Sequence, residues 1–144
     1  MSADLGRILV CEKTGQWAVA LRRVLGDTDH PVHETRSLAE CWAQLSQHPA
    51  SLVVFELTAA NVQAVVERLM DLTRRFRQAR AVVVGVPEME PFEVAARAAG
   101  AVGGAFSLLQ LAPCGRMIER HLRSLPPPTG GLRESVRRRL PWGP

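Results

Sequence analysis

The chain has 144 residues, of which 47% are apolar and 22% charged, and its formal net charge is +4. This is the size and composition of a single soluble globular domain. An acid at Asp4 and an apolar run of only four residues, 8–11, argue against a secretory signal. The uncharged stretch 98–115 contains four Gly and one Pro, so we expect a helix end, a strand and a loop there rather than a membrane span.

Apolar runs predict the strands, and apolar residues at helical spacing predict the helices. The expected strands are 7–11, 32–36, 52–57, 81–86 and 101–107. The expected helices are 15–25, 37–47, 60–78, 91–100 and 112–125. Thr14 is expected to cap the first helix, Ser37 and Glu40 form a capping-box pattern, and Pro91 follows a loop at 87–90.

Strand and helix alternate five times, which requires a parallel sheet with right-handed crossovers and helices on both faces. The second strand is polar and suits an edge, which matches the doubly wound order 2-1-3-4-5. The sequence therefore predicts a flavodoxin-like α/β domain over residues 1–125. Residues 126–144 are expected to be a Pro/Gly linker followed by a basic tail.

The side chains suggest no metal and no cofactor. Cys11, Cys41 and Cys114 have no zinc-ligand spacing and are expected to be reduced core thiols in a cytoplasmic protein. The four histidines have no convergent ligand pattern. The turn 12–16 has one Thr and one Gly, too few for the phosphate-binding loop of a flavin protein.

Three stretches resemble the receiver domain of two-component response regulators, and the likeness in element order extends over residues 5–125. Arg7-Ile-Leu-Val-Cys-Glu resembles the family's first strand with its acidic end. Leu52-Val-Val-Phe-Glu-Leu resembles the strand that carries the phosphoacceptor Asp, and Ala99-Gly-Ala resembles the approach to the fifth strand.

The resemblance implies a phosphoacceptor pocket that is degenerate in this chain. Where receivers have two acids for Mg²⁺, an Asp nucleophile, a Ser or Thr and a Lys, the aligned residues are Glu12, Lys13, Glu56, Gly85 and Ser107. Lys13 opposes a bound cation, and the extra methylene of Glu56 displaces its carboxylate by about 1.5 Å. We therefore expect no phosphorylation and no catalysis.

Two interpretations of Glu56 follow. In the first, its carboxylate is a structural group paired with Lys13 or with backbone N–H groups, and Lys13 has Glu12 as its alternative partner. In the second, Glu56 permanently imitates a phosphorylated state. The second interpretation is less favoured, because receivers respond to phosphorylation through a hydroxyl and an aromatic side chain. The resemblance places Gly85 and Gly104 at those two positions.

The function expected from the resemblance is that of a pseudo-receiver that works through protein–protein contact. Its partner is another protein or a second copy of the chain, bound through the fourth helix, fifth strand and fifth helix. The residues expected on that surface are Glu93, Arg97, Arg116 and Arg120. The main alternative is an atypical phosphoacceptor receiver.

The basic tail provides a further alternative, which is binding to nucleic acid or to another anionic surface. Four Arg against one Glu place +3 of the net charge of +4 in residues 126–144. The tail residues expected to make contacts are Leu132, Val136, Arg137, Arg138, Arg139, Leu140 and Trp142. The arginines of the third helix are interleaved with acids and are expected to form a solvated face instead.

Overall fold

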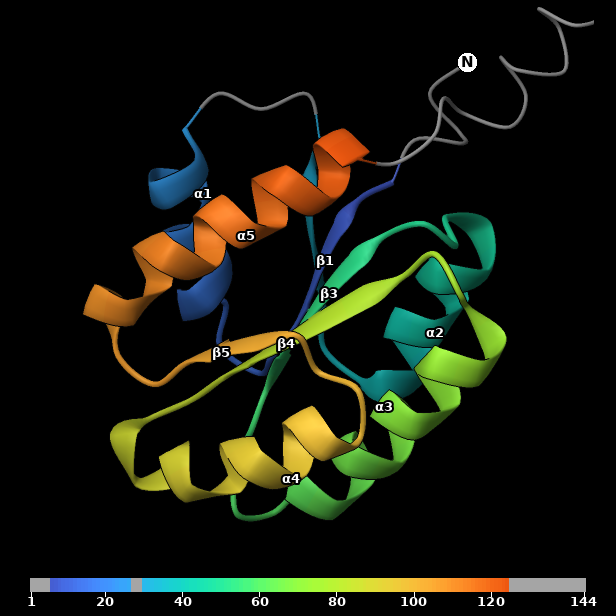
Figure 1. Ribbon diagram of the computed structural model, residues 1–144. Coiled ribbons are helices and arrows are strands. Elements are labelled where there is room, and N and C mark those ends of the chain that lie inside the picture. Colours follow the sequence, from blue (N-terminus) through green and yellow to red (C-terminus); the bar gives the residue numbers. More distant parts are fainter. Residues whose placement is uncertain (1–5, 27–29, 125–144) are drawn as a thin grey trace, which may run out of the picture.

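The computed structural model describes residues 6–26 and 30–124, so the predictions for the tail lie outside the described residues. At its centre is a five-stranded parallel sheet with the order β2-β1-β3-β4-β5, which confirms the predicted topology (Figure 1). The strands are β1 (Ile8–Cys11), β2 (Val32–Thr35), β3 (Leu52–Glu56), β4 (Arg80–Val84) and β5 (Gly103–Ala105).

Five α-helices connect and cover the described strands. They are α1 (Gln16–Leu25), α2 (Leu38–Gln47), α3 (Val62–Arg75), α4 (Glu93–Ala98) and α5 (Leu111–Ser124). Helices α1 and α5 lie on one face of the sheet, and α2, α3 and α4 lie on the other (Figure 1). The longest of them have 14 residues, and within the described ranges no helix is long and apolar enough to cross a membrane.

Alternating side chains of the buried strands enter two separate apolar layers, as the pleat of a strand requires. Leu9, Val53 and Val83 pack under α2, α3 and α4. Ile8 and Val54 pack under α1 and α5 on the other face. The strands pair in a defined register, with Cys11 opposite Phe55 and Glu56 opposite Val84.

The segment between β4 and α4 differs from the prediction. The expected loop at 87–90 is the first part of a 3₁₀ helix, η2 (Pro87–Phe92), and α4 begins only at Glu93. Pro91 explains the difference, because a proline inside an α-helix removes a hydrogen bond and clashes with the preceding turn. A second short 3₁₀ helix, η3 (Leu108–Gln110), precedes α5.

Helices α1 and α5 approach each other closely at a glycine. A Cβ atom placed on Gly115 of α5 would lie 2.5 Å from Cγ1 of Val24. That separation is far inside van der Waals contact, so a larger residue at position 115 would require the Val24 side chain or the helix to shift. The close approach fixes α1, and with it the β1–α1 connection, against the sheet.

Candidate functional site

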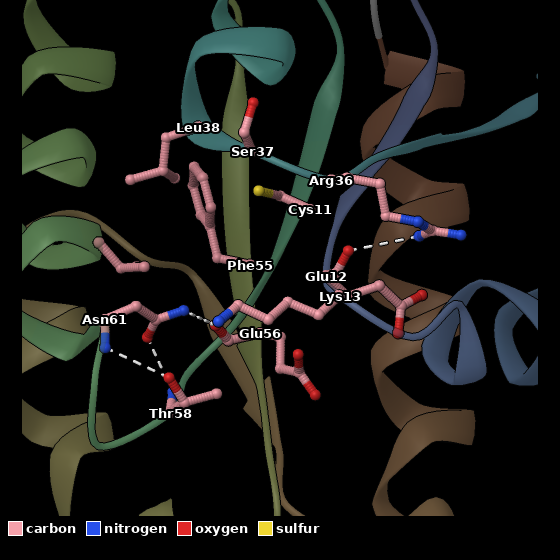
Figure 2. A pocket seen from close by; sticks show the side chains of 11 residues that line it. Cys11, Glu12, Lys13, Arg36, Ser37, Leu38, Phe55, Glu56, Thr58 and Asn61 are labelled. Carbon is pink, nitrogen blue, oxygen red and sulfur yellow. Dashed lines mark hydrogen bonds between the residues drawn. The ribbon is translucent and has the colours of Figure 1, made fainter.

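The carboxyl ends of β1 and β3 border a hollow of about 150 Å³, referred to below as the β1–β3 hollow (Figure 2). Open α/β sheets keep their ligand sites at this edge. Of the five aligned positions, Glu12, Lys13 and Glu56 line this hollow. The remaining lining residues are Cys11, Arg36, Ser37, Leu38, Phe55, Thr58, Asn61 and Val65.

Glu12 is the N-terminal cap of α1. Its Oε1 accepts a hydrogen bond from the backbone N–H of Trp17 at 2.9 Å, and its Oε2 accepts one from Ala18 at 2.8 Å. The carboxylate thus satisfies two of the free N–H groups of the first helical turn and sits at the positive end of the helix dipole. Glu12 is only 3% exposed, so it is a buried structural group.

The cap predicted at Thr14 is wrong. The residue before α1 is Gly15, whose φ of 89° turns the chain back so that the helix begins over Glu12. Thr14 contributes only one long contact, 3.5 Å between its Oγ1 and the backbone nitrogen of Gln16. Glycine adopts this left-handed conformation at little cost, which is why the turn is possible here.

The ion pair predicted for Lys13 is absent from the described part of the chain. The Glu12 carboxylate is already engaged with α1, and Glu56 forms no ion pair with Lys13. Lys13 is exposed and Glu56 is half-buried, so water reaches both charges and a surface pair would gain little. The structural role expected for the Glu56 carboxylate is therefore not seen.

The main chain of Glu56 is held by the loop that follows β3. Asn61 Nδ2 donates to the Glu56 carbonyl at 2.8 Å, and its Oδ1 accepts from the backbone N–H of Thr58 at 2.8 Å. Thr58 Oγ1 in turn accepts from the backbone N–H of Asn61 at 3.2 Å (Figure 2). Sequence reasoning missed this turn, although a Thr and an Asn three residues apart are typical of it.

A second cation stands at the rim of the hollow. Arg36 Nη2 lies 2.8 Å from Glu34 Oε1, and its Nη1 donates to the main-chain oxygen of Glu12 at 3.3 Å. Hydrogen bonds from Arg36 and then Arg22 lower the pKa of Glu34. With Lys13 and Arg36 beside one available acid, Glu56, the hollow is poorly suited to a divalent cation.

Gly85 and Ser107 do not line the β1–β3 hollow. They line a second hollow of about 310 Å³, between the start of α1 and the ends of β4 and β5. Its other lining residues are Gln16, Trp17, Val19, Ala20, Arg23, Val86, Pro87, Phe106 and Leu108. The five aligned positions therefore border two hollows at the same carboxyl edge of the sheet, and Gly85 lies close to the end of β3, where Glu56 stands opposite Val84.

Gly85 and Gly104, which the resemblance aligns with the switch residues of receivers, are closely packed. A Cβ on Gly85 would lie 3.0 Å from the carbonyl oxygen of Leu57, which leaves no room for a hydroxyl side chain without a shift. A Cβ on Gly104 would lie 2.9 Å from Glu93 Oε2 and 3.1 Å from Phe106 Cε2. A side chain at position 104 would therefore require Glu93 and Phe106 to shift.

Exposed apolar side chains that sequence reasoning missed lie on α4 and on η3, the short helix directly before α5. Val94 is 77% exposed, Leu108 69% and Leu109 91%. The four residues predicted for the surface of α4, β5 and α5 behave differently from one another: Glu93 and Arg97 form an ion pair at 2.9 Å within α4, whereas Arg116 and Arg120 are exposed on α5. In Figure 1, β5 runs between α4 and α5 at the edge of the sheet.

The arginines of α3 are engaged within the molecule. The Arg68 guanidinium lies 4.8 Å from the centre of the Trp42 ring, and Trp42 Nε1 donates to Asp71 at 3.1 Å. Arg75 pairs with the same Asp71 at 3.3 Å. This face is therefore a network of internal contacts. Across residues 6–26 and 30–124, no group of three or more His, Cys, Asp or Glu side chains is placed to hold a metal ion.

The fold is that of receiver domains. No protein-family model and no curated protein sequence matches the chain, but solved structures do. A response regulator from Thermotoga maritima covers 83% of this chain and 99% of its own, with a TM-score of 0.68 and 15% identity. A CheY-like protein (tadZ) from Pseudomonas aeruginosa PAO1 covers 84% and 96%, with a TM-score of 0.65 and 19% identity.

A third neighbour is described as an atypical orphan response regulator with a phosphorylation-independent regulatory mechanism. It covers 83% of this chain and 97% of its own, with a TM-score of 0.64 and 19% identity. At such identities the likeness establishes the fold, whereas the chemistry has to be argued from the site itself.

Proposed function

We propose that this protein is a non-catalytic pseudo-receiver that acts through protein–protein contact without being phosphorylated. The observation that carries the proposal is the engagement of Glu12: both of its carboxylate oxygens accept hydrogen bonds from the first turn of α1. The acid that receivers would use at this position to hold Mg²⁺ serves here as a helix cap. A neighbour with a phosphorylation-independent mechanism is consistent with the proposal by analogy.

The rest of the edge supports the same function. Phosphoryl transfer requires positioned groups that neutralise charge around the transferred phosphoryl group. Glu56 has Lys13 and Arg36 around its hollow, whereas Gly85 and Ser107 line the other one. The free thiols of Cys11, Cys41 and Cys114 suit the cytoplasm, which we propose as the site of action.

The contact surface we propose is the one made by α4, β5 and α5, with a second copy of the chain as the first partner to test. Val94 on α4, and Leu108 and Leu109 on η3 directly before α5, are large apolar side chains exposed to water. Burial of one leucine contributes about 1.5–3 kcal/mol, which corresponds to roughly 10-fold to 100-fold in affinity. Arg116 and Arg120 would add charge selectivity at the rim.

Sedimentation velocity of the full chain over a range of concentrations tests this surface. We expect Leu109→Glu to weaken self-association at least 10-fold. Met70→Glu is the matched control, because Met70 is 42% exposed on α3, away from the proposed surface. It should behave like the unmodified protein, and so should Glu56→Gln. A chain that stays monomeric at ~100 μM, or that tolerates Leu109→Glu, would refute the proposed contact.

We also propose that residues 126–144 form a unit separate from the domain at 1–125, with Leu132, Val136, Leu140 and Trp142 available to a partner. Deletion of residues 126–144 should leave the melting temperature unchanged and remove any partner or anionic-ligand binding that depends on them. Binding that survives the deletion would show that the tail is not the contact segment. A steep loss of binding with added salt would favour an anionic partner.

A further inference from the structure

Two of the three cysteines lie in the same apolar layer, one lining the β1–β3 hollow and the other buried behind it. Cys11 ends β1, lines the hollow and is partly exposed. In Figure 2 its sulfur points toward Ser37 and Leu38, where α2 begins. Cys41 lies three residues after Leu38, on the same face of α2, and is fully buried against the sheet.

Cys41 belongs to the apolar layer against which Cys11 packs, and the two thiols differ in character. The hydrogen bond from Cys41 lowers the pKa of Cys11, against the effects of burial and of the Glu40 and Glu56 carboxylates, while the Thr35 hydroxyl assists. The same contact and burial raise the pKa of Cys41. Cys11 is thus the better nucleophile, and it is also the thiol that a small reagent can reach.

We propose that Cys11 is a modification site for small hydroperoxides and that Cys41 is its resolving thiol, so that oxidation links β1 to α2 by a disulfide. The proposal is independent of any phosphorylation and of any partner. Only Cys11 is accessible from the hollow, so it is oxidised first. Cys41 lies beside it and reacts second, with the oxidised Cys11.

The chemistry balances with the hydroperoxide as the oxidant. The Cys11 sulfur attacks the outer oxygen of the peroxide, the O–O bond breaks, and Cys11 becomes a sulfenic acid as the alcohol leaves. The Cys41 sulfur then attacks the Cys11 sulfur, and water leaves. In total, the two thiols lose two electrons and two protons, and one hydroperoxide is reduced to one alcohol and one water.

Cys114 is an internal control. It is buried in the other apolar layer, under α1 and α5, and neither of the other two cysteines belongs to that layer. Burial raises the pKa of its thiol to about 11, so it is a weak nucleophile at neutral pH. Cys114 therefore differs from Cys11 in two ways: it is buried, and no other cysteine lies in its apolar layer. The two thiols can be compared within one molecule.

Peptide mapping of the native, reduced full chain tests the proposal, because each cysteine lies in its own tryptic peptide. These peptides are 8–13 for Cys11, 37–68 for Cys41 and 98–116 for Cys114. With limiting iodoacetamide, we expect peptide 8–13 to be alkylated at least 10-fold faster than the other two. With hydrogen peroxide as the probe, the intact mass should fall by two hydrogen atoms, and peptides 8–13 and 37–68 should be joined until a reductant is added.

Two variants separate the roles. Cys41→Ser should stop at a Cys11 sulfenic acid that dimedone traps, and Cys114→Ser should form the same disulfide as the unmodified chain. If Cys41→Ser does not fold, the map of the unmodified chain decides alone. Faster labelling of Cys114, an unchanged mass after peroxide, or a link between the Cys11 residues of two chains would overturn the proposal.

Discussion

Replacing Glu12 should destabilise the protein, because this carboxylate holds the start of α1. Glu12→Ala leaves two backbone N–H groups, those of Trp17 and Ala18, without their acceptors in a buried place. Loss of an N-terminal cap costs about 0.5–2 kcal/mol, and hydrogen bonds to a charged group are worth about 1.5–3 kcal/mol. We expect a loss of about 2–3 kcal/mol for Glu12→Ala.

Glu12→Gln isolates the contribution of the charge and of one hydrogen bond. The amide keeps an oxygen that accepts from one N–H group, but its NH₂ group faces the other. We expect a loss of about 1 kcal/mol, between the unmodified protein and Glu12→Ala. Lys13→Ala is the matched control: its side chain is exposed and its charge is unpaired, so its effect should stay within about 0.5 kcal/mol.

Urea denaturation followed by tryptophan fluorescence and far-UV circular dichroism measures these differences. Trp17 lies in the capped turn and is buried, so its emission contributes to the signal together with that of the other two tryptophans, Trp42 and Trp142. Thermal unfolding should show the same order, with Glu12→Ala lowered by about 6–12 °C. If Glu12→Ala is as stable as Lys13→Ala, the carboxylate is not a structural cap, and the reasoning behind the proposed function fails.

Three further predictions concern close packing and a buried thiol. Gly115→Ala should cost about 1–2 kcal/mol despite the better helix propensity of alanine, and a second change, Val24→Ala, should restore most of the loss. Gly85→Ser should cost about 1–2 kcal/mol, because its Cβ meets the Leu57 carbonyl oxygen, and a gain in stability would contradict the packing. The Cys114 thiol has its pKa raised to about 11, so between the unfolded value of ~8.5 and that value the folded chain holds more protons, and stability falls as pH rises. Cys114→Ala lacks this thiol, so the difference in free energy of unfolding between it and the unmodified chain should shrink by about 1–2 kcal/mol from roughly pH 8 to pH 10. Urea denaturation at several pH values measures this difference, and a difference that does not change with pH would contradict the prediction.

The fold could be predicted from the sequence because its determinants are local. The apolar runs that became β1, β3 and β4 and the alternation with amphipathic helices already dictate a parallel sheet. The polar β2 indicates its place at the edge. The segment around Pro91 was predicted less well, since the choice between a loop and a 3₁₀ helix depends on how η2 packs, and Met89 is buried there.

The site could be predicted only in part, because side-chain direction at a strand end is not local. Glu12 and Glu56 were placed at the correct edge, but the turn at Gly15 decides that Glu12 faces α1. The contact of Cys11 with Cys41 joins two elements 30 residues apart in sequence, and no local pattern signals it.

The most direct test of the proposed function is the intact mass of the full chain after incubation with acetyl phosphate and Mg²⁺. A receiver with its phosphoacceptor Asp, treated in parallel, shows that the conditions allow transfer. We predict that the mass of this protein stays unchanged, because Glu12 is engaged with α1, and Lys13 and Arg36 line the hollow in which Glu56 would have to bind a metal ion. Addition of one phosphoryl group that is lost in Glu56→Gln would contradict the account.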